Sequence, residues 1–273
     1  MSTYLCYTNM NIVITDPVKC ECFGNLFQHV RLFSEHVNIT FDKERMYMQS
    51  MDSSRVSVFE LSLPADWFDV YEYTVEESCT LGINTSMLFK ILNTRDKIQN
   101  THIRYDPNGD DSDKLFVRFD CENKSVFDKL FEIPLMDLDC DVMEIPAGES
   151  DAEFSIASTN FASIIAQLKL FGDTIEVRCD EDKIELHSIS LDTGKMTVCI
   201  DIDDLTSYAI TEDEKMDLSF SLSILHNICQ YHKVAKEVEI HLTKDFPMKL
   251  IYHLGADNAT FTFYLAPKIS DSE

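Results

Sequence analysis

The stretch that decides the fold of this chain is Phe23-Gly24-Asn25-Leu26-Phe27-Gln28-His29-Val30-Arg31-Leu32-Phe33, in which the apolar residues fall at helical spacing. The same template returns at a constant offset in residue number, so that Phe23, Leu26, Phe27, Val30 and Phe33 match Phe161, Ile164, Ile165, Leu168 and Phe171. Both stretches run into alternating, strand-like patterns at the same offset, with Val37, Ile39, Phe41, Met46 and Met48 matching Ile175, Val177, Cys179, Ile184 and Leu186. One such match is a common coincidence, but several in the same order indicate an internal duplication.

Two further matches extend the duplication at slightly smaller offsets. Leu81, Ile83, Ser86, Leu88 and Ile91 match Leu218, Phe220, Ser223, Leu225 and Ile228, a strand passing into a second helix. Near the end of each half, Phe131 and Pro134 match Tyr264 and Pro267. Each half is therefore predicted to be an α+β unit with two helices on a largely antiparallel sheet of eight or nine short strands. The predicted domains are residues 1–134 and 153–273, joined by a connector at residues 135–152.

Composition restricts the function. The 273 residues are 45% hydrophobic and carry a net charge of −25, which repels a phosphate backbone, so that any contact with DNA must be local. No window approaches 18 uncharged apolar residues, and the N-terminus lacks a secretory pattern, so we expect an intracellular protein. Nine scattered cysteines suit a reducing compartment.

The predicted helices carry a net positive charge, although the chain as a whole is acidic. Their windows are residues 19–34, 84–95, 156–171 and 221–236, and the only acidic residue among them is Glu21. They hold seven cations, namely Lys19, Arg31, Lys90, Arg95, Lys169, Lys233 and Lys236. Exposed helical faces ordinarily accept glutamate, so its exclusion indicates a surface that tolerates a polyanion without reading its sequence.

Other chemistry is not supported by the spacing of the residues. Cys20 and Cys22 lack a second close ligand pair for zinc, and His226, Cys229 and His232 diverge around a helix. The sequence has no phosphate-binding glycine loop and no nucleophile or metalloprotease motif. We therefore predict no metal, no cofactor and no catalytic activity.

Four blocks of the chain resemble one known family. They are Met48-Gln49-Ser50-Met51-Asp52-Ser53-Ser54-Arg55-Val56-Ser57, Gly82-Ile83-Asn84-Thr85-Ser86-Met87 with Lys90-Ile91-Leu92, Leu135-Met136-Asp137-Leu138-Asp139 with Ile145-Pro146, and Tyr264-Leu265-Ala266-Pro267-Lys268-Ile269. In order and content they resemble proliferating cell nuclear antigen, the eukaryotic DNA sliding clamp, in a divergent form that a virus could encode. The resemblance implies the DNA clamp fold, two duplicated domains that assemble into a ring.

The resemblance also implies an assembly and partners. Three chains would close head to tail into a homotrimer around double-stranded DNA, with the seven helix cations facing the hole, and an ATP-dependent clamp loader would open the ring. The subunit interface would involve Lys129, Phe131 and Ile133 with Met196, Val198 and Ile200 of the next copy. DNA polymerase and other repair and replication proteins would dock a PIP-box peptide in a pocket formed by Met51, Val56, Val58, Met143, Ile145, Pro146, Pro247, Tyr264, Ala266 and Pro267.

Two alternatives stay open at this stage. One is a subunit of a heterotrimeric, checkpoint-type clamp. The other is an acidic scaffold or decoy that keeps the peptide pocket without encircling DNA, because several cations of the family are replaced by neutral residues such as Gly24, Asn93 and Ser163. The expected location is the nucleus, or a cytoplasmic site of viral replication.

Overall fold

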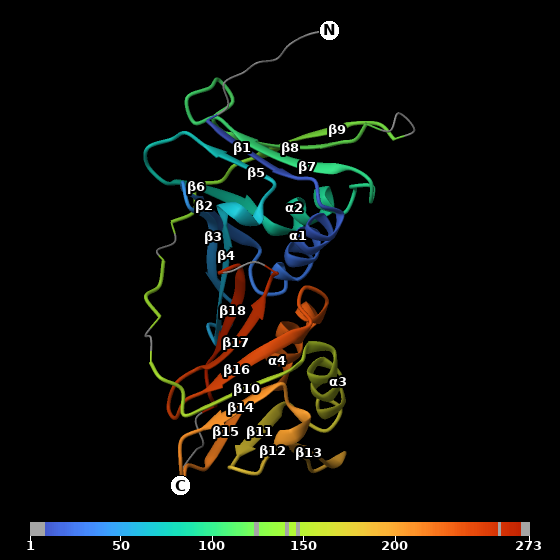
Figure 1. The fold of residues 1–273 in the computed structure, drawn as a ribbon, viewed down its shortest axis with the longest axis vertical. Coiled ribbons are helices and arrows are strands. Elements are labelled where there is room, and N and C mark those ends of the chain that lie inside the picture. The colour runs from blue at the N-terminus through green and yellow to red at the C-terminus, as the bar shows by residue number, and fades with distance from the viewer. Residues whose placement is uncertain (1–8, 123–125, 140–141, 146–147, 256–257, 269–273) are drawn as a thin grey trace. The chain divides into compact units, whose positions relative to one another are not determined.

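The structure is a computed structural model that describes residues 9–122, 126–139, 142–145, 148–255 and 258–268 (Figure 1). Its α-helices are α1 (Pro17–Val30), α2 (Thr85–Leu92), α3 (Ser158–Leu168) and α4 (Leu222–Ile228). Short 3₁₀ helices are η1 (Ala65–Trp67), η2 (Ile202–Asp204) and η3 (Cys229–Lys233). All four predicted helices are thus present and end earlier than their windows, and the second half of the fourth is a 3₁₀ turn rather than α-helix.

The strands fall into two series. The first is β1 (Met10–Ile14), β2 (His36–Phe41), β3 (Arg45–Met51), β4 (Ser57–Pro64), β5 (Val70–Tyr73), β6 (Cys79–Asn84), β7 (Asn100–Tyr105), β8 (Lys114–Asp120) and β9 (Lys129–Pro134). The second is β10 (Ala152–Ala157), β11 (Thr174–Cys179), β12 (Lys183–Ser190), β13 (Gly194–Asp201), β14 (Ser207–Ile210), β15 (Met216–Ser221), β16 (Glu237–Leu242), β17 (Met248–His253) and β18 (Thr260–Leu265). Helices and strands follow one another in the same order in both series, which confirms the predicted duplication.

Strand registers repeat as well. Ile39 lies opposite Met48 between β2 and β3, and their sequence matches Val177 and Leu186 lie opposite each other between β11 and β12. The match of Phe131 with Tyr264 was wrong by one residue. Phe131 pairs with Val117 on β8, and the equivalent residue of β18 is Phe263, which pairs with Leu250 on β17. The error arose because the sequence pattern aligned two prolines, whereas hydrogen bonds define the register.

Contacts divide the chain into two units. The first holds Met1–Ser50, Leu61–Val142 and Ala256–Ala259, and the second holds Met51–Glu60, Met143–Gly255 and Thr260–Glu273. In sheet order, the first series forms β5-β1-β7-β8-β9 and β4-β3-β2-β6, and the second forms β14-β10-β16-β17-β18 and β13-β12-β11-β15. Neighbouring strands such as β1 and β5, β10 and β16, and β12 and β13 are antiparallel, which confirms an α+β fold. The predicted boundaries at residues 134 and 153 stay a prediction.

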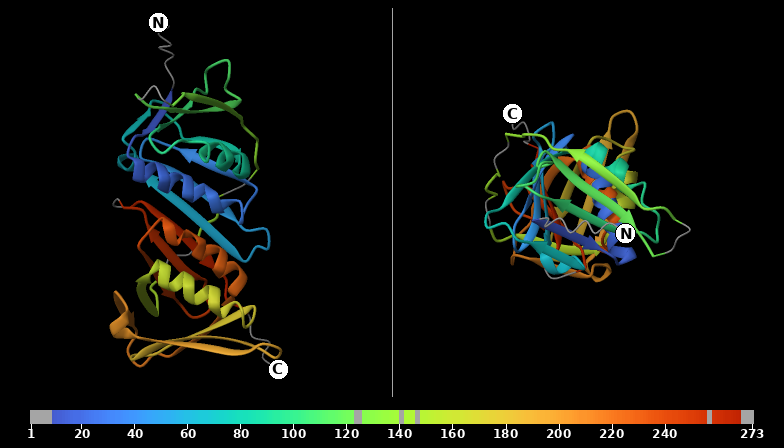
Figure 2. Two further views of the ribbon diagram at one scale, coloured as in Figure 1. Left: turned by 90° about the vertical axis from the view of Figure 1, so that its right-hand side faces the viewer. Right: turned by 90° about the horizontal axis from the view of Figure 1, so that it is seen from above.

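The helices pack on these sheets with their apolar faces. In the first unit α1 contacts α2, β1 and β7, and the two helices lie side by side in Figure 2. The repeated template forms the core of each unit: Phe23, Leu26, Phe27, Val30, Phe33, Phe161, Ile165 and Leu168 are buried, and Ile164 and Phe171 are half-buried. Burial of this stripe stabilises each helix by tertiary packing, because helices of this length are marginal alone.

Local signals begin the two helices of the first unit. The Asp16 carboxylate accepts hydrogen bonds from the backbone N–H groups of Val18 (2.7 Å) and Lys19 (3.1 Å) ahead of α1, and Pro17 occupies the first helical position. The Asn84 side chain accepts from the Met87 N–H at 2.9 Å ahead of α2. These caps fix where the cationic helices start.

Candidate functional site

The first feature is the helix surface of the first unit. Arg31 is exposed at the C-terminal cap of α1, and its guanidinium lies 5.0 Å from the ring centroid of Phe89 on α2. Lys90, the next residue along α2, is also exposed. Two predicted DNA-contacting cations from helices far apart in the sequence therefore lie on adjoining parts of one helical surface, where both can contact a polyanion.

The second unit has a corresponding surface. Lys169 caps the C-terminus of α3, which packs against α4 and η3. Burial, together with the Lys169 ammonium, lowers the pKa of His226 on α4, so this imidazole is neutral at physiological pH and adds no cation. Lys233, at the end of η3, and Lys236, just beyond it, are exposed.

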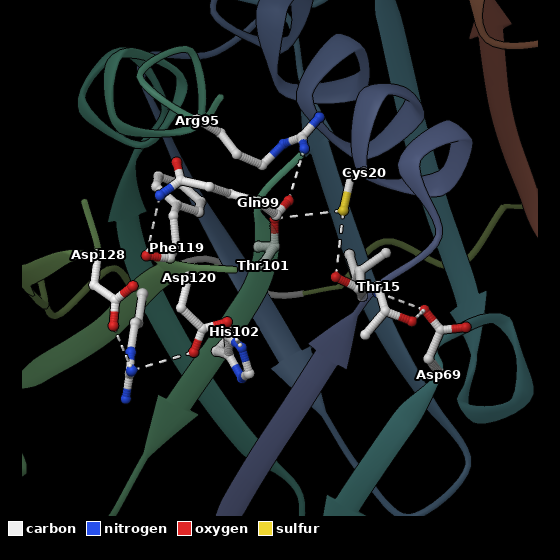
Figure 3. Close-up of polar contacts among 12 residues, drawn as sticks. Thr15, Cys20, Asp69, Arg95, Gln99, Thr101, His102, Phe119, Asp120 and Asp128 are labelled. Atoms are coloured by element: carbon white, nitrogen blue, oxygen red, sulfur yellow. Dashed lines mark hydrogen bonds and ion pairs between the residues drawn. The ribbon is translucent and has the colours of Figure 1, made fainter. Parts of the chain in front are cut away.

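Three of the predicted cations contact other groups within the described residues, and one of them is Arg31, whose Nε donates to the Gln28 carbonyl at 3.2 Å. One guanidinium nitrogen of Arg95 donates to the carbonyl oxygens of Asp96, Lys97 and Gln99 at 3.1, 3.2 and 2.8 Å, and the contact with Gln99 is drawn in Figure 3. Lys19 lies 4.0 Å from the Asp69 carboxylate and 5.8 Å from the ring centroid of Trp67. Arg95 thus orders the turn after α2, which the sequence pattern did not show.

The second feature is a pair of edge strands. β9 and β13 each end a sheet, and within the described residues each has one neighbouring strand. On β9, Lys129 and Phe131 are partly exposed and Ile133 is buried; on β13, Met196 and Val198 are partly exposed and Ile200 is buried. Long edges of this kind present unpaired backbone groups to another strand.

The third feature is a groove of about 800 Å³ in the second unit. It is lined by Ile145, Gly148, Glu149, Ser150, Asp151, Glu153, Ala209, Ile210, Thr211, His241, Thr243, Phe246, Pro247, Lys249 and Tyr264. Three predicted pocket residues, Ile145, Pro247 and Tyr264, are among them. A concave apolar surface with polar groups at its rim is typical of a ligand or peptide site.

The other predicted pocket residues lie along the same unit. Ala266 donates its N–H to the carbonyl of Val56 at 2.9 Å, and the Tyr264 hydroxyl lies 3.1 Å from Glu60, which shares a face of β4 with Val58. Met51, Met143 and Pro267 are half-buried, and none of the nine described members of the set is fully buried. Pro146 lies outside the described residues.

Sequence reasoning missed part of this groove. Phe246 is 48% exposed and precedes Pro247 in a turn where Asp245 has a positive φ of 62°. His241 lies on β16, where its ring contacts Ser150 at 3.2 Å and Glu239. An exposed phenylalanine beside a proline is a usable signal, but His241 reaches the groove only through sheet pairing.

The turn between β3 and β4 supports this unit through Asp52. Burial would raise the pKa of the Asp52 carboxyl, but hydrogen bonds from Ser54 and Ser57 outweigh burial and lower it. Its oxygens accept from the N–H of Ser54 and of Val56, both at 2.9 Å, and Arg55 takes a positive φ of 58°. The buried carboxylate therefore holds the turn in one conformation.

Replacing Asp52 with alanine is expected to lower the free energy of unfolding by roughly 1–3 kcal/mol at pH 7, because several donors lose their acceptor. Since the folded-state pKa is lowered, this stabilisation is present above the ordinary value of about 3.9 and is lost as the pH falls through the lowered one. Urea unfolding of both proteins between pH 7 and pH 3 measures the difference. A difference in the free energy of unfolding that stays constant across this pH range would contradict the role of the ionised carboxylate.

Other site types find no support among the described residues. No group of three or more His, Cys, Asp or Glu side chains in this part of the chain is arranged to hold a metal ion. Cys20 instead donates its thiol to the carbonyl of Ile14 at 3.3 Å, and burial raises the pKa of Cys22 to about 12. No helix in the described ranges is long and apolar enough to cross a membrane.

Two copies of one α+β unit, with helices almost free of acidic residues, define a DNA clamp protein. The family model for the N-terminal domain of proliferating cell nuclear antigen matches residues 18–143, and the model for its C-terminal domain matches residues 144–268. This chain belongs to the proliferating cell nuclear antigen family. It is 26% identical to "Proliferating cell nuclear antigen 2" of Plasmodium falciparum (isolate 3D7) over 262 residues, which cover 92% of this chain and 97% of that relative.

Membership of the family defines the general role. The chain is a sliding-clamp protein of DNA replication and not an enzyme, as the sequence predicted. The boundary between the two family matches, at residues 143 and 144, falls inside the predicted connector.

Proposed function

We propose that this chain closes into a homotrimeric ring, encircles double-stranded DNA with its helix surfaces, and recruits DNA polymerase and other PIP-box proteins through the groove of the second unit. The ring would hold DNA by topology, so each contact can stay weak while the protein slides. An ATP-dependent loader would open the closed ring.

The observation that carries the proposal is a strand pair inside the chain. β18 is the hydrogen-bonded neighbour of β4, and this contact involves residues Ser57–Glu60 of the second unit. In the duplicated order, β9 is the counterpart of β18 and β13 is the counterpart of β4. The two counterparts are edge strands, so pairing β9 of one copy with β13 of the next repeats the internal joint. Such a heterologous contact forms a ring when the rotation closes.

The helix surfaces support DNA encirclement. Among the four α-helices the only acidic residue is Glu21, whereas Arg31, Lys90 and Lys169 lie at exposed or half-exposed positions. Sparse cations give contacts with the phosphate backbone that are interchangeable from one base pair to the next.

The groove supports recruitment of a short aromatic peptide. Double replacement of Ile145 with serine and Tyr264 with alanine is expected to weaken binding of a fluorescent PIP-box peptide at least about 100-fold, because two apolar contacts worth roughly 1.5–3 kcal/mol each are lost. Fluorescence anisotropy measures the affinity. Neither side chain is fully buried, so the thermal transition should stay close to that of the unmodified protein. Unchanged peptide affinity would place the partner site elsewhere.

The assembly is tested by native mass and by DNA retention. Native mass spectrometry at micromolar concentration should give three copies of the 31.4 kDa chain. Protein loaded on nicked circular DNA should remain bound in high salt and should leave when the circle is cut. A chain that stays monomeric until other subunits are added would favour the heterotrimeric clamp, and a trimer that is never retained on circles would favour the decoy. The site of action, nuclear or viral, stays a prediction.

A further inference from the structure

A small hollow lies in the first unit beside the edge strand β9. Its volume is about 310 Å³, and its lining residues are Asn84, Ser86, Met87, Lys90, Ile133, Pro134 and Met136. Met87 and Met136 are 49% and 41% exposed, so apolar surface faces solvent here. Exposed apolar hollows of this kind commonly mark an interaction site.

An exposed leucine lies in the second unit, at the turn between β12 and β13. Leu191 is fully exposed, and Leu170 and Ile189 nearby are 71% and 59% exposed. The turn is held against the end of α3, because the Thr193 hydroxyl donates to the carbonyl of Phe171 at 3.4 Å. Leu191 thus projects from an anchored turn at the start of an edge strand.

One hydrogen bond between β4 and β18, the internal joint of the chain, fixes which of their residues are opposite each other. The Ala266 N–H donates to the Val56 carbonyl, and the Phe59 ring lies 5.8 and 6.2 Å from the rings of Phe261 and Phe263. Later residues of β4 contact earlier residues of β18, so the two strands are antiparallel. Val56 therefore lies opposite Ala266, and the turn with Arg55 at a positive φ of 58° ends the paired stretch.

The duplication transfers this register to β9 and β13. From β4 onward, Ala65 at the start of η1 corresponds to Ile202 at the start of η2, and Phe131 on β9 corresponds to Phe263 on β18. The bond from Lys268 N–H to the Ser219 carbonyl repeats the bond from Met136 N–H to the Gly82 carbonyl under the same correspondence. The pairs expected between two copies are Phe131 with Met196, Glu132 with Lys195, Leu130 with Thr197 and Asp128 with Cys199.

We propose that Leu191 of one copy fills the hollow beside β9 of the next copy, and that this contact sets the register of the subunit joint. The transferred register places Gly194, the first residue of β13, opposite Ile133, which lines the hollow, and Leu191 lies in the turn directly before Gly194. The residue that corresponds to Leu191 at the internal joint, Ser54, is polar. A joint between separate chains lacks a covalent tether, so apolar burial stabilises it where the internal joint needs none. The inference rests on the proposed homotrimer.

Charge agrees with the same register. Glu132 on β9 is exposed and opposes Lys195 on β13, which is also exposed. Opposite charges at directly opposed positions of two antiparallel strands are favourable, and like charges there are unfavourable. A shift by one residue would place Glu132 opposite Gly194 or Met196 and would lose this pair.

A single substitution tests the register. In Asp128→Cys, the new thiol should lie opposite native Cys199 of the next copy, because directly opposed residues of antiparallel strands have Cα separations of about 4.5–5.5 Å, within the range of a disulfide. Asp128 and Cys199 are exposed, and Asp128 carries an ion pair with Arg118 at 2.8 Å (Figure 3). Oxidation with diamide should give covalent dimers and trimers on a non-reducing gel.

The matched controls for the cross-link are two variants. Addition of Cys199→Ser to Asp128→Cys should abolish the covalent dimers and trimers. Leu130→Cys alone should give little covalent dimer, because its thiol lies two residues further along the strand. Strong cross-linking of Leu130→Cys with none for Asp128→Cys would overturn the register.

A second variant tests the leucine contact. Leu191→Asp should raise the concentration at which the trimer dissociates by roughly 10- to 100-fold per joint, the loss expected for one buried leucine. Leu191→Met should dissociate like the unmodified protein, and Val142→Asp, at another exposed apolar position, should have no effect. Sedimentation velocity over a dilution series measures this.

The outcomes separate the two proposals. If unmodified protein forms no homotrimer at any concentration, the proposed assembly fails. If the trimer forms and Leu191→Asp leaves its dissociation unchanged, the leucine contact is wrong and the homotrimer stands.

Discussion

Replacement of Thr197 with proline is expected to leave the chain monomeric and unable to remain on circular DNA. Val56 presents its carbonyl to β18, and its counterpart in the second unit is Thr193, directly before β13. Backbone groups alternate in direction along a strand, so the N–H of Thr197 points to the free edge of β13. Proline removes that donor and leaves the facing carbonyl without a partner, at a cost of about 1–3 kcal/mol in each joint.

Native mass spectrometry and retention on nicked circular DNA measure the result for Thr197→Pro. The β12–β13 pair should survive, because proline is tolerated at an edge where its nitrogen faces away from the neighbouring strand. On β9 the counterpart of Ala266 is Pro134, which has no N–H, so the joint between copies lacks the bond that Ala266 donates to Val56 and depends on bonds further along the strands, including the one from Thr197. Thr197→Ala is the matched control and should remain a trimer. A Thr197→Pro variant that keeps both the trimer and retention on circles would exclude the β9–β13 joint.

Charge reversal on the helices is expected to have the second largest effect. Exchange of Arg31, Lys169 and Lys233 for glutamate turns three cations of each chain into anions, so DNA inside a ring of three chains is repelled. We expect polymerase processivity to fall at least about tenfold near 100 mM salt, because each lost phosphate contact also lowers the salt-dependent affinity. The trimer should persist, since none of the three residues lies on β9 or β13.

The matched control makes the same number of charge reversals at positions outside the α-helices. Lys43, Lys97 and Lys215 are exposed and lie outside the α-helices, so their exchange for glutamate gives an equal net charge without altering the helix surfaces. Primer-extension length on singly primed circular DNA distinguishes the two triple variants. Equal stimulation of the polymerase by both would contradict DNA contact through the helices.

Much of the fold could be predicted because its signals are local. The template from Phe23 to Phe33 specifies a helix with one apolar face, and its repetition from Phe161 shows the duplication without coordinates. The near absence of acidic residues from the helices could also be predicted from the sequence, because it depends only on which residues belong to the same helix.

The candidate site was harder to predict from the sequence than the fold. Ile145, Pro247 and Tyr264 were found through family resemblance, whereas Phe246 and His241 were not, because β16, β17 and the connector meet only after folding. Arg95 looked like a free cation, yet it donates to three backbone carbonyls. Backbone acceptors at a turn carry no signature in the sequence.

The two α+β halves, their apolar faces and the distribution of charge follow from the order of amino acids, because hydrophobic periodicity and local composition depend on residues close together in the chain. The edge positions of β9 and β13, the correspondence of Phe131 with Phe263 rather than Tyr264, and the groove beside Tyr264 became visible in the folded chain. These features depend on hydrogen bonds between strands far apart in sequence. Side-chain patterns repeat every second residue and leave the pairing register to be set by the whole fold.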